Sequence, residues 1–191
     1  MRNLLRQLRP AFVALLVLTA LTGIVYPLVV TGIAQVAFKD KANGSVVKKD
    51  GVAVGSTLIG QGFADAKYFH PRPSAGSYDA MASGASNLGP TNPDFLDQIE
   101  KRVADYRTEN ALTADQAVPG DAVTTSGSGL DPDISVANAR LQAARVARAR
   151  GMEVSAMMNV LDAHTIGRQL DFLGEPRVNV LAINLALDSG S

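Results

Sequence analysis

The stretch of the sequence best suited to bind a ligand is TTSGSGLDPDIS, residues 124–135. A Ser/Gly loop just before a helical pattern can hold an anion with its backbone N–H groups. However, Asp131 and Asp133 would repel a phosphate, and Asp131-Pro132 is typical of an ordinary bend. The pattern favours a turn or a contact surface, and an anion or other ligand site at Ser126–Gly129 is the alternative.

Signatures of catalysis are missing from the sequence. It has no G-x-S-x-G elbow, no G-x-x-x-x-G-K-[ST] phosphate loop and no D-K-T-G stretch of the kind that P-type pumps phosphorylate. It has no cysteine, which excludes disulfides and thiolate metal sites. Its two histidines, His70 and His164, are 94 positions apart. We therefore expect no catalytic residue, no metal site and no directly bound cofactor.

One long stretch reads as a loop. YFHPRPSAGSYDAMASGASNLGPTNP, residues 68–93, holds four prolines and three glycines and has no apolar run at helix or strand spacing. Loops of this length are usually functional or disordered. The aromatic residues Tyr68, Phe69 and Tyr78 argue against a disordered linker, so the sequence predicts an ordered, functional loop.

The elements around this loop predict one compact domain of α/β or α+β class. Asp50-Gly51 between two valine-rich runs indicates a hairpin. Helices are expected after Asn92, after Ser135 and from Val154, and the first of them should bury Leu96, Ile99, Val103 and Tyr106. A short strand is expected after Pro119, and the arginines at positions 140, 145, 148 and 150 are expected on a solvated face. We also expect a strand in RVNVLAINLAL, residues 177–187. Its apolar residues at both odd and even positions suggest burial on both faces of a sheet.

The N-terminus predicts a membrane anchor. Residues 1–10 carry three arginines and no acid, and the next 28 residues, 11–38, carry no charge. As a helix they would span about 42 Å, more than the hydrocarbon core of about 30 Å. A cleaved signal peptide is the alternative, but its apolar region would usually be about 7–15 residues. Positive residues favour the cytoplasmic side, so we expect residues 1–10 inside and 39–191 outside.

Charge argues against a nucleic-acid partner. The formal net charge is zero, and the part beyond the anchor holds 15 basic and 18 acidic residues. A mildly acidic domain disfavours nucleic-acid binding.

The anchor also has a face suited to helix packing. Thr19, Gly23, Pro27 and Thr31 follow one another at i+4 and form a ridge of small or polar residues. Such residues let membrane helices approach closely, and Pro27 frees a carbonyl that a neighbour or a nearby threonine could bond. We expect this ridge to contact another helix.

Several stretches together resemble the C subunit of the bacterial high-affinity potassium-transporting ATPase, the KdpC family. They follow a single N-terminal span in the family's order and cover nearly the whole chain. Ala85 stands where a second glycine is usual, and Asp133 where histidine is usual. The matching stretches are GSTLIGQGF, YFHPRPSAGSYDAMASGASNLGPTNP, VTTSGSGLDPDIS, ARLQAARVARARG and FLGEPRVNVLAINLALD.

The resemblance implies an accessory, non-catalytic subunit of a complex in the bacterial inner membrane. Its partners would be a channel-like potassium-translocating subunit, a P-type ATPase subunit and a very small membrane subunit, and that complex would handle ATP and K⁺. The family is described as a catalytic chaperone that raises the ATP affinity of the pump subunit. Because the topology places residues 39–191 outside and ATP is hydrolysed inside, we expect that effect to be indirect.

Two sets of interface residues follow from the resemblance. The long loop becomes an interaction surface, whose prolines reduce the entropy lost on binding. The stretch Ser83–Asn87 is compared with an ABC-transporter signature, which makes Ser83, Gly84, Ser86 and Asn87 weak nucleotide candidates. The expected contact residues of the domain are Tyr68, Phe69, Arg72, Pro73, Ser74, Asn87, Leu88, Gly89 and Asn92.

Overall fold

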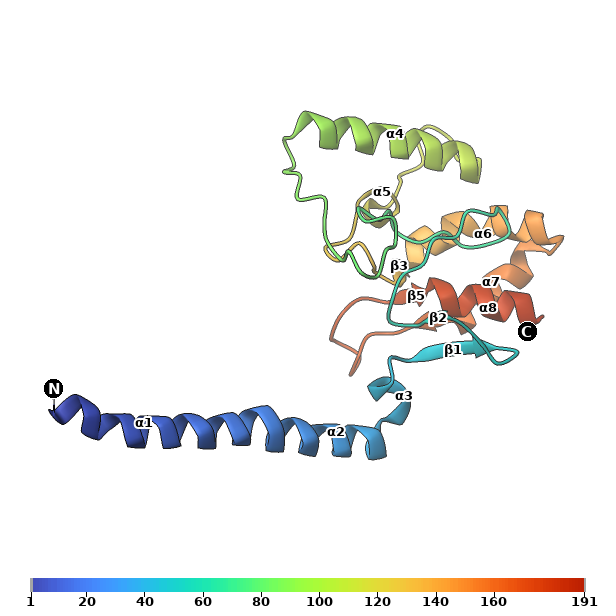
Figure 1. Ribbon diagram of the computed structural model, residues 1–191. Helices are drawn as coiled ribbons and strands as arrows, with labels where there is room; N and C mark the ends of the chain where they lie inside the picture. The colour runs from blue at the N-terminus through green and yellow to red at the C-terminus, as the bar shows by residue number, and fades with distance from the viewer. Residues whose placement is uncertain (1, 191) are drawn as a thin grey trace. The chain divides into compact units, whose positions relative to one another are not determined.

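The structure is a computed structural model that describes residues 2–190, and the chain divides into two units at Val46/Val47. The N-terminal unit is almost entirely helical (Figure 1). Its elements are α1 (Arg2–Ala20), a π-helical turn η1 (Leu21–Val25), α2 (Tyr26–Ala37) and the short α3 (Lys39–Ala42).

Proline explains the π-helical turn. Pro27 has no N–H, and its ring would clash with the carbonyl four residues back, that of Gly23. The helix widens just upstream, where the Tyr26 N–H donates to Leu21 O, five residues back. The helix therefore continues through Pro27 with an altered ladder instead of breaking.

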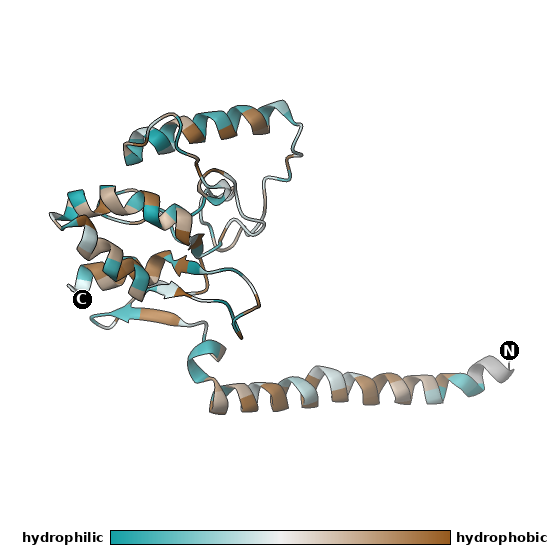
Figure 2. Ribbon diagram, turned by 180° about the vertical axis from the view of Figure 1, so that it is seen from behind, coloured by the Kyte–Doolittle hydropathy of each residue, from teal (hydrophilic) through white to brown (hydrophobic). Residues whose placement is uncertain are grey.

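Hydrophobic residues recur along most of this helix (Figure 2), and its large apolar side chains are exposed. The stretch Arg6–Ala37 is long and apolar enough to cross a membrane. It is the one helix of that kind among residues 2–190, which confirms the predicted long apolar helix at the N-terminus. It begins before residue 11 and ends at Ala37, so the exact limits of a membrane span stay a prediction.

The C-terminal domain combines two small sheets with helices. The hairpin expected around Asp50-Gly51 is present as β1 (Val46–Lys49) and β2 (Val52–Ser56). The second sheet is antiparallel with the order β3-β5-β4 and comprises β3 (Asp133–Ser135), β4 (Thr165–Ile166) and β5 (Arg177–Asn179).

The remaining regular elements of the described domain are helices. Three of them begin at side-chain caps: Asn92 accepts from the Phe95 N–H, Ser135 from Asn138 and Asn179 from Ala182. Gly151 ends α6 in the left-handed conformation. The helices are α4 (Pro93–Asn110), α5 (Gly120–Val123), α6 (Val136–Arg150), α7 (Val154–Ala163) and α8 (Val180–Ser189).

The hydrophobic core lies between the sheet, α6, α7 and α8. The loop predicted over residues 68–93 begins earlier in the structure: residues 57–92, called the long loop from here on, contain no helix or strand, and they contribute to the core. The core cluster consists of Phe69, Ile134, Ala139, Ala143, Val146, Ala147, Met157, Leu161, Val178, Val180, Ile183 and Leu187.

One predicted strand is wrong, and another was predicted too long. The segment after Pro119 is the short helix α5, whose Thr124 N–H and Oγ1 both bond Gly120 O. The predicted C-terminal strand stops at Asn179, where that residue caps α8. Burial on α8 follows helical spacing, because Val180, Ile183, Asn184 and Leu187 are buried.

Burial on two helices also differs from expectation. In α4 only Tyr106 and Asn110 are buried, and Leu96, expected in the buried stripe, is exposed. The arginines of α6 do not share a solvated face: Arg140 and Arg148 are exposed, but Arg145 is buried. Its partners are described below.

Candidate functional site

The most organised polar feature of the domain is a set of side chains that bind the backbone of residues 66–70. This part of the long loop has no neighbouring strand, yet buried backbone groups need hydrogen-bond partners. Asn184 of α8 accepts from the Phe69 N–H at 2.8 Å and donates to Phe69 O at 3.0 Å. Gln142 of α6 does the same for His70, at 2.7 and 3.1 Å.

Two arginines complete this side-chain clamp, which we define as Gln142, Arg145, Arg150 and Asn184. Arg145 Nη1 donates to Ala66 O and Tyr68 O at 2.7 and 3.0 Å. Arg150 Nε donates to Lys67 O at 2.7 Å. The carbonyls of residues 66–70 are thus all held by side chains of α6 and α8, which fixes this part of the long loop.

Phe69, one of the predicted contact residues, is buried within the domain. Its side chain is 0% exposed and belongs to the core cluster, so in this fold it is covered by the domain itself. The clamp explains this position, because it pins the Phe69 backbone on both sides. Tyr68 is half-buried: its hydroxyl donates to Asp188 Oδ2 at 2.9 Å, and its ring lies against Phe63 and Arg150.

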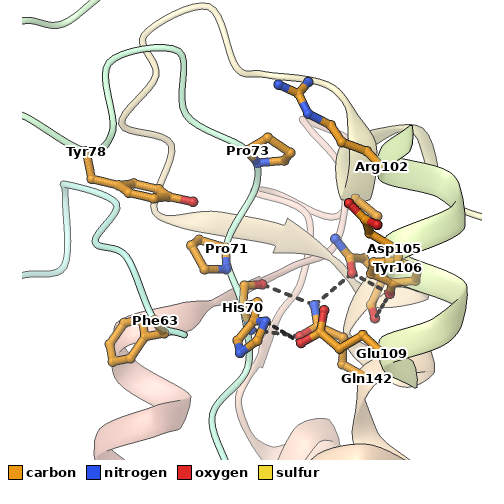
Figure 3. A pocket seen from close by; sticks show the side chains of 12 residues that line it. Phe63, His70, Pro71, Pro73, Tyr78, Arg102, Asp105, Tyr106, Glu109 and Gln142 are labelled. Atoms are coloured by element: carbon orange, nitrogen blue, oxygen red, sulfur yellow. Dashed lines mark hydrogen bonds and ion pairs between the residues drawn. The ribbon is translucent and has the colours of Figure 1, made fainter. Parts of the chain in front are cut away.

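An ion-pair cluster joins this segment to α4. Glu109 Oε1 lies 2.8 Å from His70 Nδ1 and 3.6 Å from Arg145 Nε (Figure 3). The hydrogen bond from His70 lowers the pKa of the Glu109 carboxyl below its usual value. Burial lowers the pKa of the Arg145 guanidinium, and Asn110 Oδ1 accepts from its Nε at 3.0 Å. Each of these charges therefore has a counter-charge or a polar partner.

These residues border a pocket of about 240 Å³ between the long loop and α4 (Figure 3). Phe63, Pro71, Pro73 and Tyr78 line it from the loop, and α4 lines it with charged side chains. Tyr106 closes its floor, where its hydroxyl donates to Asn138 Oδ1 at 2.8 Å and burial raises the pKa of the phenol. No nucleophile–base pair lies among these lining residues.

The next part of the loop is held by Arg72. Its Nη1 lies 3.0 Å from Asp131 Oδ2, and the Tyr78 hydroxyl donates to its carbonyl at 2.8 Å. Ser74 Oγ accepts from the Tyr78 N–H at 2.9 Å. The predicted contact residues Arg72 and Ser74 thus serve the loop's own structure, and with Pro73 they are half-buried.

The two Ser/Gly stretches meet each other. Ser128 O accepts from the Gly84 N–H at 2.8 Å and from Ser83 Oγ at 3.1 Å. Gly129 has φ +68°, and a Cβ there would lie 2.7 Å from Gly84 O. The loops of residues 83–87 and 124–131 therefore form one surface, which we call the paired loops.

Neither stretch resembles a phosphate cradle in this arrangement. The Gly84 N–H and the Ser83 hydroxyl are committed to Ser128 O, and the Gly129 N–H donates to Ser126 O at 3.3 Å. Ser126 is itself buried. These bonds agree with the turn that the sequence favours at 126–129, whereas nucleotide contact by Ser83, Gly84, Ser86 or Asn87 stays a prediction.

The last predicted contact residues lie where the loop approaches α4. Asn87, with φ 56°, and Gly89 are exposed, Leu88 is half-buried, and Asn92 caps α4. Met81, at 94% exposure, is the most exposed large apolar side chain of the loop. The segment of residues 79–91 is consequently the part of the loop that is open to a partner.

The anchor ridge lies on the helical unit. Thr19 belongs to α1, Gly23 to η1, and Pro27 and Thr31 to α2, and all four are exposed. Positions at i+4 drift by about 40° per step in an α-helix, which has 3.6 residues per turn. The wider π-turn between Thr19 and Pro27 reduces this drift, so the ridge runs straighter than the sequence predicts.

Metal ligands do not gather anywhere in residues 2–190: no group of three His, Asp or Glu side chains is placed to hold an ion. His70 is engaged by the loop and α4. The ring of His164 lies 2.9 Å from Val160 O at the end of α7. The two histidines thus have separate local partners.

Sequence reasoning missed the clamp. Its amide members, Gln142 of α6 and Asn184 of α8, are each only 1% exposed. A buried amide needs partners for both its donor and its acceptor. That requirement was the available signal, although it does not identify which backbone segment would supply the partners.

Comparisons with known proteins agree with one another. A family model described as KdpC, K⁺-transporting ATPase, c chain, matches residues 8–189. The potassium-transporting ATPase KdpC subunit of Mycobacterium tuberculosis H37Rv is 58% identical over 185 residues, which cover 96% of this chain and 98% of that protein. The chain belongs to the KdpC family. The KdpC subunits of Rhodospirillum rubrum and Cereibacter sphaeroides KD131 are 56% and 52% identical to it, each over 97% of this chain and 96% and 98% of their own lengths.

This KdpC-family chain is therefore a subunit of a potassium-transporting ATPase complex, which implies other Kdp subunits. The match includes most of the apolar helix as well as the domain, and that helix is consistent with a membrane anchor. Asp133, which replaces the histidine usual in the resemblance, accepts from Arg177 Nε at 2.8 Å and from Asn179 Nδ2 at 3.1 Å. It thus ties β3 to β5.

Proposed function

We propose that the chain is a non-catalytic assembly subunit of the potassium pump. The observation that carries this proposal is the polar network of the domain: its charged and amide side chains fix the long loop rather than surround a reactive group. The domain thereby presents a preformed surface, made of residues 79–91 and the paired loops, to other subunits. Preformed surfaces lose less entropy on binding.

In this proposal the apolar helix spans the membrane and packs against a helix of the channel-like subunit through its ridge. Gly23 has open space around the position of a Cβ, so a larger side chain there fits the isolated helix and would disturb only a contact with another helix. Gly32 is equally open and lies off the ridge. The pair gives a matched test of the contact.

The decisive experiment is a mild-detergent pull-down of the tagged full-length chain from its host, starved of potassium, with mass spectrometry of the partners. We expect a P-type ATPase subunit, a channel-like subunit and potassium-stimulated ATP hydrolysis. Gly23→Leu should lower the yield of the complex and Gly32→Leu should not. Recovery of the chain alone from membranes that contain those subunits would refute the assembly role.

We further propose that residues 39–191 lie outside the cell and affect ATP affinity indirectly. A subunit that binds one conformation of the pump better than another shifts its equilibrium without touching ATP. The topology is directly testable because the chain has no cysteine. Met81→Cys should react with a membrane-impermeant maleimide in intact cells, and Gln7→Cys should react only after permeabilisation.

A direct nucleotide contact makes a different prediction. If Ser83 and Ser86 touch ATP, the double alanine variant should raise the KM for ATP of the assembled pump severalfold. The indirect role predicts an unchanged KM at equal yield of the complex. A raised KM, together with labelling of Met81→Cys from the cytoplasmic side, would overturn both the topology and the indirect role.

A further inference from the structure

The loop between β4 and β5, residues 167–176, carries a concentrated group of exposed apolar side chains. Leu170, Phe172 and Leu173 are 76%, 69% and 47% exposed. Figure 1 shows this loop entering β5 and projecting beyond the sheet and the helices, so we call it the apolar arm. Exposed apolar patches mark sites of contact with proteins or membranes. The arm therefore calls for a partner outside the domain.

The backbone of the arm holds these side chains outward in a fixed turn. The Gln169 N–H donates to Leu173 O and the Leu173 N–H donates to Gln169 O, both at 2.9 Å. Between them, Leu170 and Asp171 have φ of 52° and 64°, a conformation that is uncommon for residues other than glycine. An apolar loop without such a turn could fold back onto the core, whereas this one presents its apolar residues to the surroundings.

The arm lies at the end of the domain where the chain arrives from the apolar helix. Figures 1 and 2 show the arm and the hairpin β1–β2 at the same end of the domain, opposite α4. The hairpin also exposes apolar side chains there, those of Val46 and Val52. Because only residues 38–45 separate α2 from β1, chain length keeps β1 within about 30–35 Å of the end of the apolar helix. A bilayer that holds this helix is then the apolar phase nearest to this end of the domain.

We propose that the apolar arm enters the membrane surface and gives the domain a second attachment besides the apolar helix. A protein partner would need about 800 Å² of contact on this side, and three side chains supply only part of that. A bilayer needs no matching surface, and leucine and phenylalanine are typical of segments that enter the boundary between headgroups and acyl chains. The proposal rests on the membrane-spanning helix proposed above and not on the pump partners.

Asp171 limits the depth of this contact. Its side chain is exposed at the tip, between Leu170 and Phe172. A charged group is costly within the hydrocarbon core, so the carboxylate stays among the headgroups. The apolar neighbours then reach only the shallow boundary region, about 5–10 Å deep. Two attachments also restrict how the domain turns over the membrane, which orients the surface of residues 79–91 toward other subunits.

Single tryptophan reporters in the full-length protein test the proposal, because the chain contains no tryptophan of its own. The protein is placed in nanodiscs of phosphatidylcholine and phosphatidylglycerol, with lipids brominated either near the headgroup or near the chain end. Phe172→Trp should emit at shorter wavelength than Leu96→Trp, and the shallow bromines should quench it most. Leu18→Trp, in the apolar helix, should be quenched most by the deep bromines. Leu96→Trp, on α4 at the opposite end of the domain, should be quenched by neither.

These reporters separate the possible failures. If Leu18→Trp is quenched and Phe172→Trp is not, the arm stays out of the bilayer, and this proposal is refuted while the membrane anchor stands. If Leu18→Trp is not quenched, the anchor and the arm proposal fail together. Because tryptophan itself favours membrane interfaces, Leu170→Ser is added to Phe172→Trp and should weaken the quenching. Unchanged quenching would show that the introduced ring, rather than the native arm, binds the lipid, which also refutes the proposal.

A photoreactive analogue of phenylalanine identifies the neighbour of the arm in the cell. p-Benzoylphenylalanine in place of Phe172, irradiated in the intact host, should yield a lipid adduct on the peptide that contains the arm, detected by mass spectrometry. The same analogue in place of Leu96 should yield no lipid adduct. A cross-link from position 172 to another protein as the main product would overturn the proposal in favour of a protein partner.

Discussion

Asn184→Ala tests whether the side-chain clamp holds the long loop in place. Asn184 is 1% exposed and pairs with both the N–H and the C=O of Phe69, 115 positions earlier in the chain. Alanine removes both partners at once. Each buried backbone group left without a partner costs about 1–3 kcal/mol, so two give about 2–6 kcal/mol.

A smaller effect opposes this loss. Alanine has a helix propensity better than that of asparagine by up to about 0.7 kcal/mol, and Asn184 lies within α8. The free energy of unfolding should therefore fall by about 1–5 kcal/mol. Asn159→Ala in α7 is the matched control, because Asn159 is exposed and its side chain has no hydrogen bond within residues 2–190. The unfolding free energy of Asn159→Ala should therefore change only by the gain in helix propensity.

Urea unfolding of the full-length chain in detergent micelles, followed by circular dichroism, measures both variants. The anchor helix stays in the micelle, so the transition reports the C-terminal domain. A midpoint of Asn184→Ala within error of that of Asn159→Ala would refute the reasoning. Residues 66–70 would then be held by the Phe69 ring rather than by the side-chain clamp.

Two further predictions concern the paired loops and the end of α8. Gly129→Ala should destabilise the domain by more than about 1 kcal/mol, because φ is +68° and a Cβ would lie 2.7 Å from a backbone oxygen, whereas Gly127→Ala, with open space around it, should be nearly neutral in the same urea assay. Burial raises the pKa of the Asp188 carboxyl, but hydrogen bonds from Arg150 and Tyr68 outweigh it and lower that pKa overall. Its contribution to stability should be complete above about pH 4 and lost as the pH falls through the lowered pKa. Asp188→Asn should therefore flatten the acid side of a plot of unfolding free energy against pH, and an unchanged slope would contradict this.

The sequence predicted the elements that depend on local chemistry. Asn92 and Ser135 cap helices where their side chains can accept from an N–H three residues on, and Gly151 ends α6 where a left-handed residue is needed. The hairpin at Asp50-Gly51 has the same kind of cause. Such signals lie within a few residues of the structure that they specify, so one sequence is enough to find them.

The error at α8 shows where local signals conflict. Residues 178–187 are apolar on both parities, which fits a strand buried on both faces. They also place buried residues at i, i+3, i+4 and i+7 from Val180. Asn179 as a cap and Gly190 as a left-handed end favour the helix, and both were readable from the sequence. The length of the run also favours a helix, because strands are usually shorter.

The position of Phe69 could not be read in the same way. Its surroundings are loop-like, and Asn184, which bonds its backbone, follows 115 residues later. Gln142, which bonds the backbone of the next residue, His70, follows that residue by 72 positions. Arg145 was expected on a solvated face because arginine is rarely buried unless it is paired. Its partners are carbonyls of the loop, which a pattern of side chains does not reveal.

The long loop therefore combines two roles in different parts. Residues 66–70 are held by the side-chain clamp and supply a core residue, whereas residues 79–91 remain open. Fixing the first part limits the motion of the second, since both belong to one chain segment and Arg72 and Tyr78 brace the connection between them. A weakened clamp should then reduce complex yield even where no contact residue has changed. Mutations in α6 or α8 that impair assembly would be explained by the loop that these helices hold, rather than by a partner surface on the helices themselves.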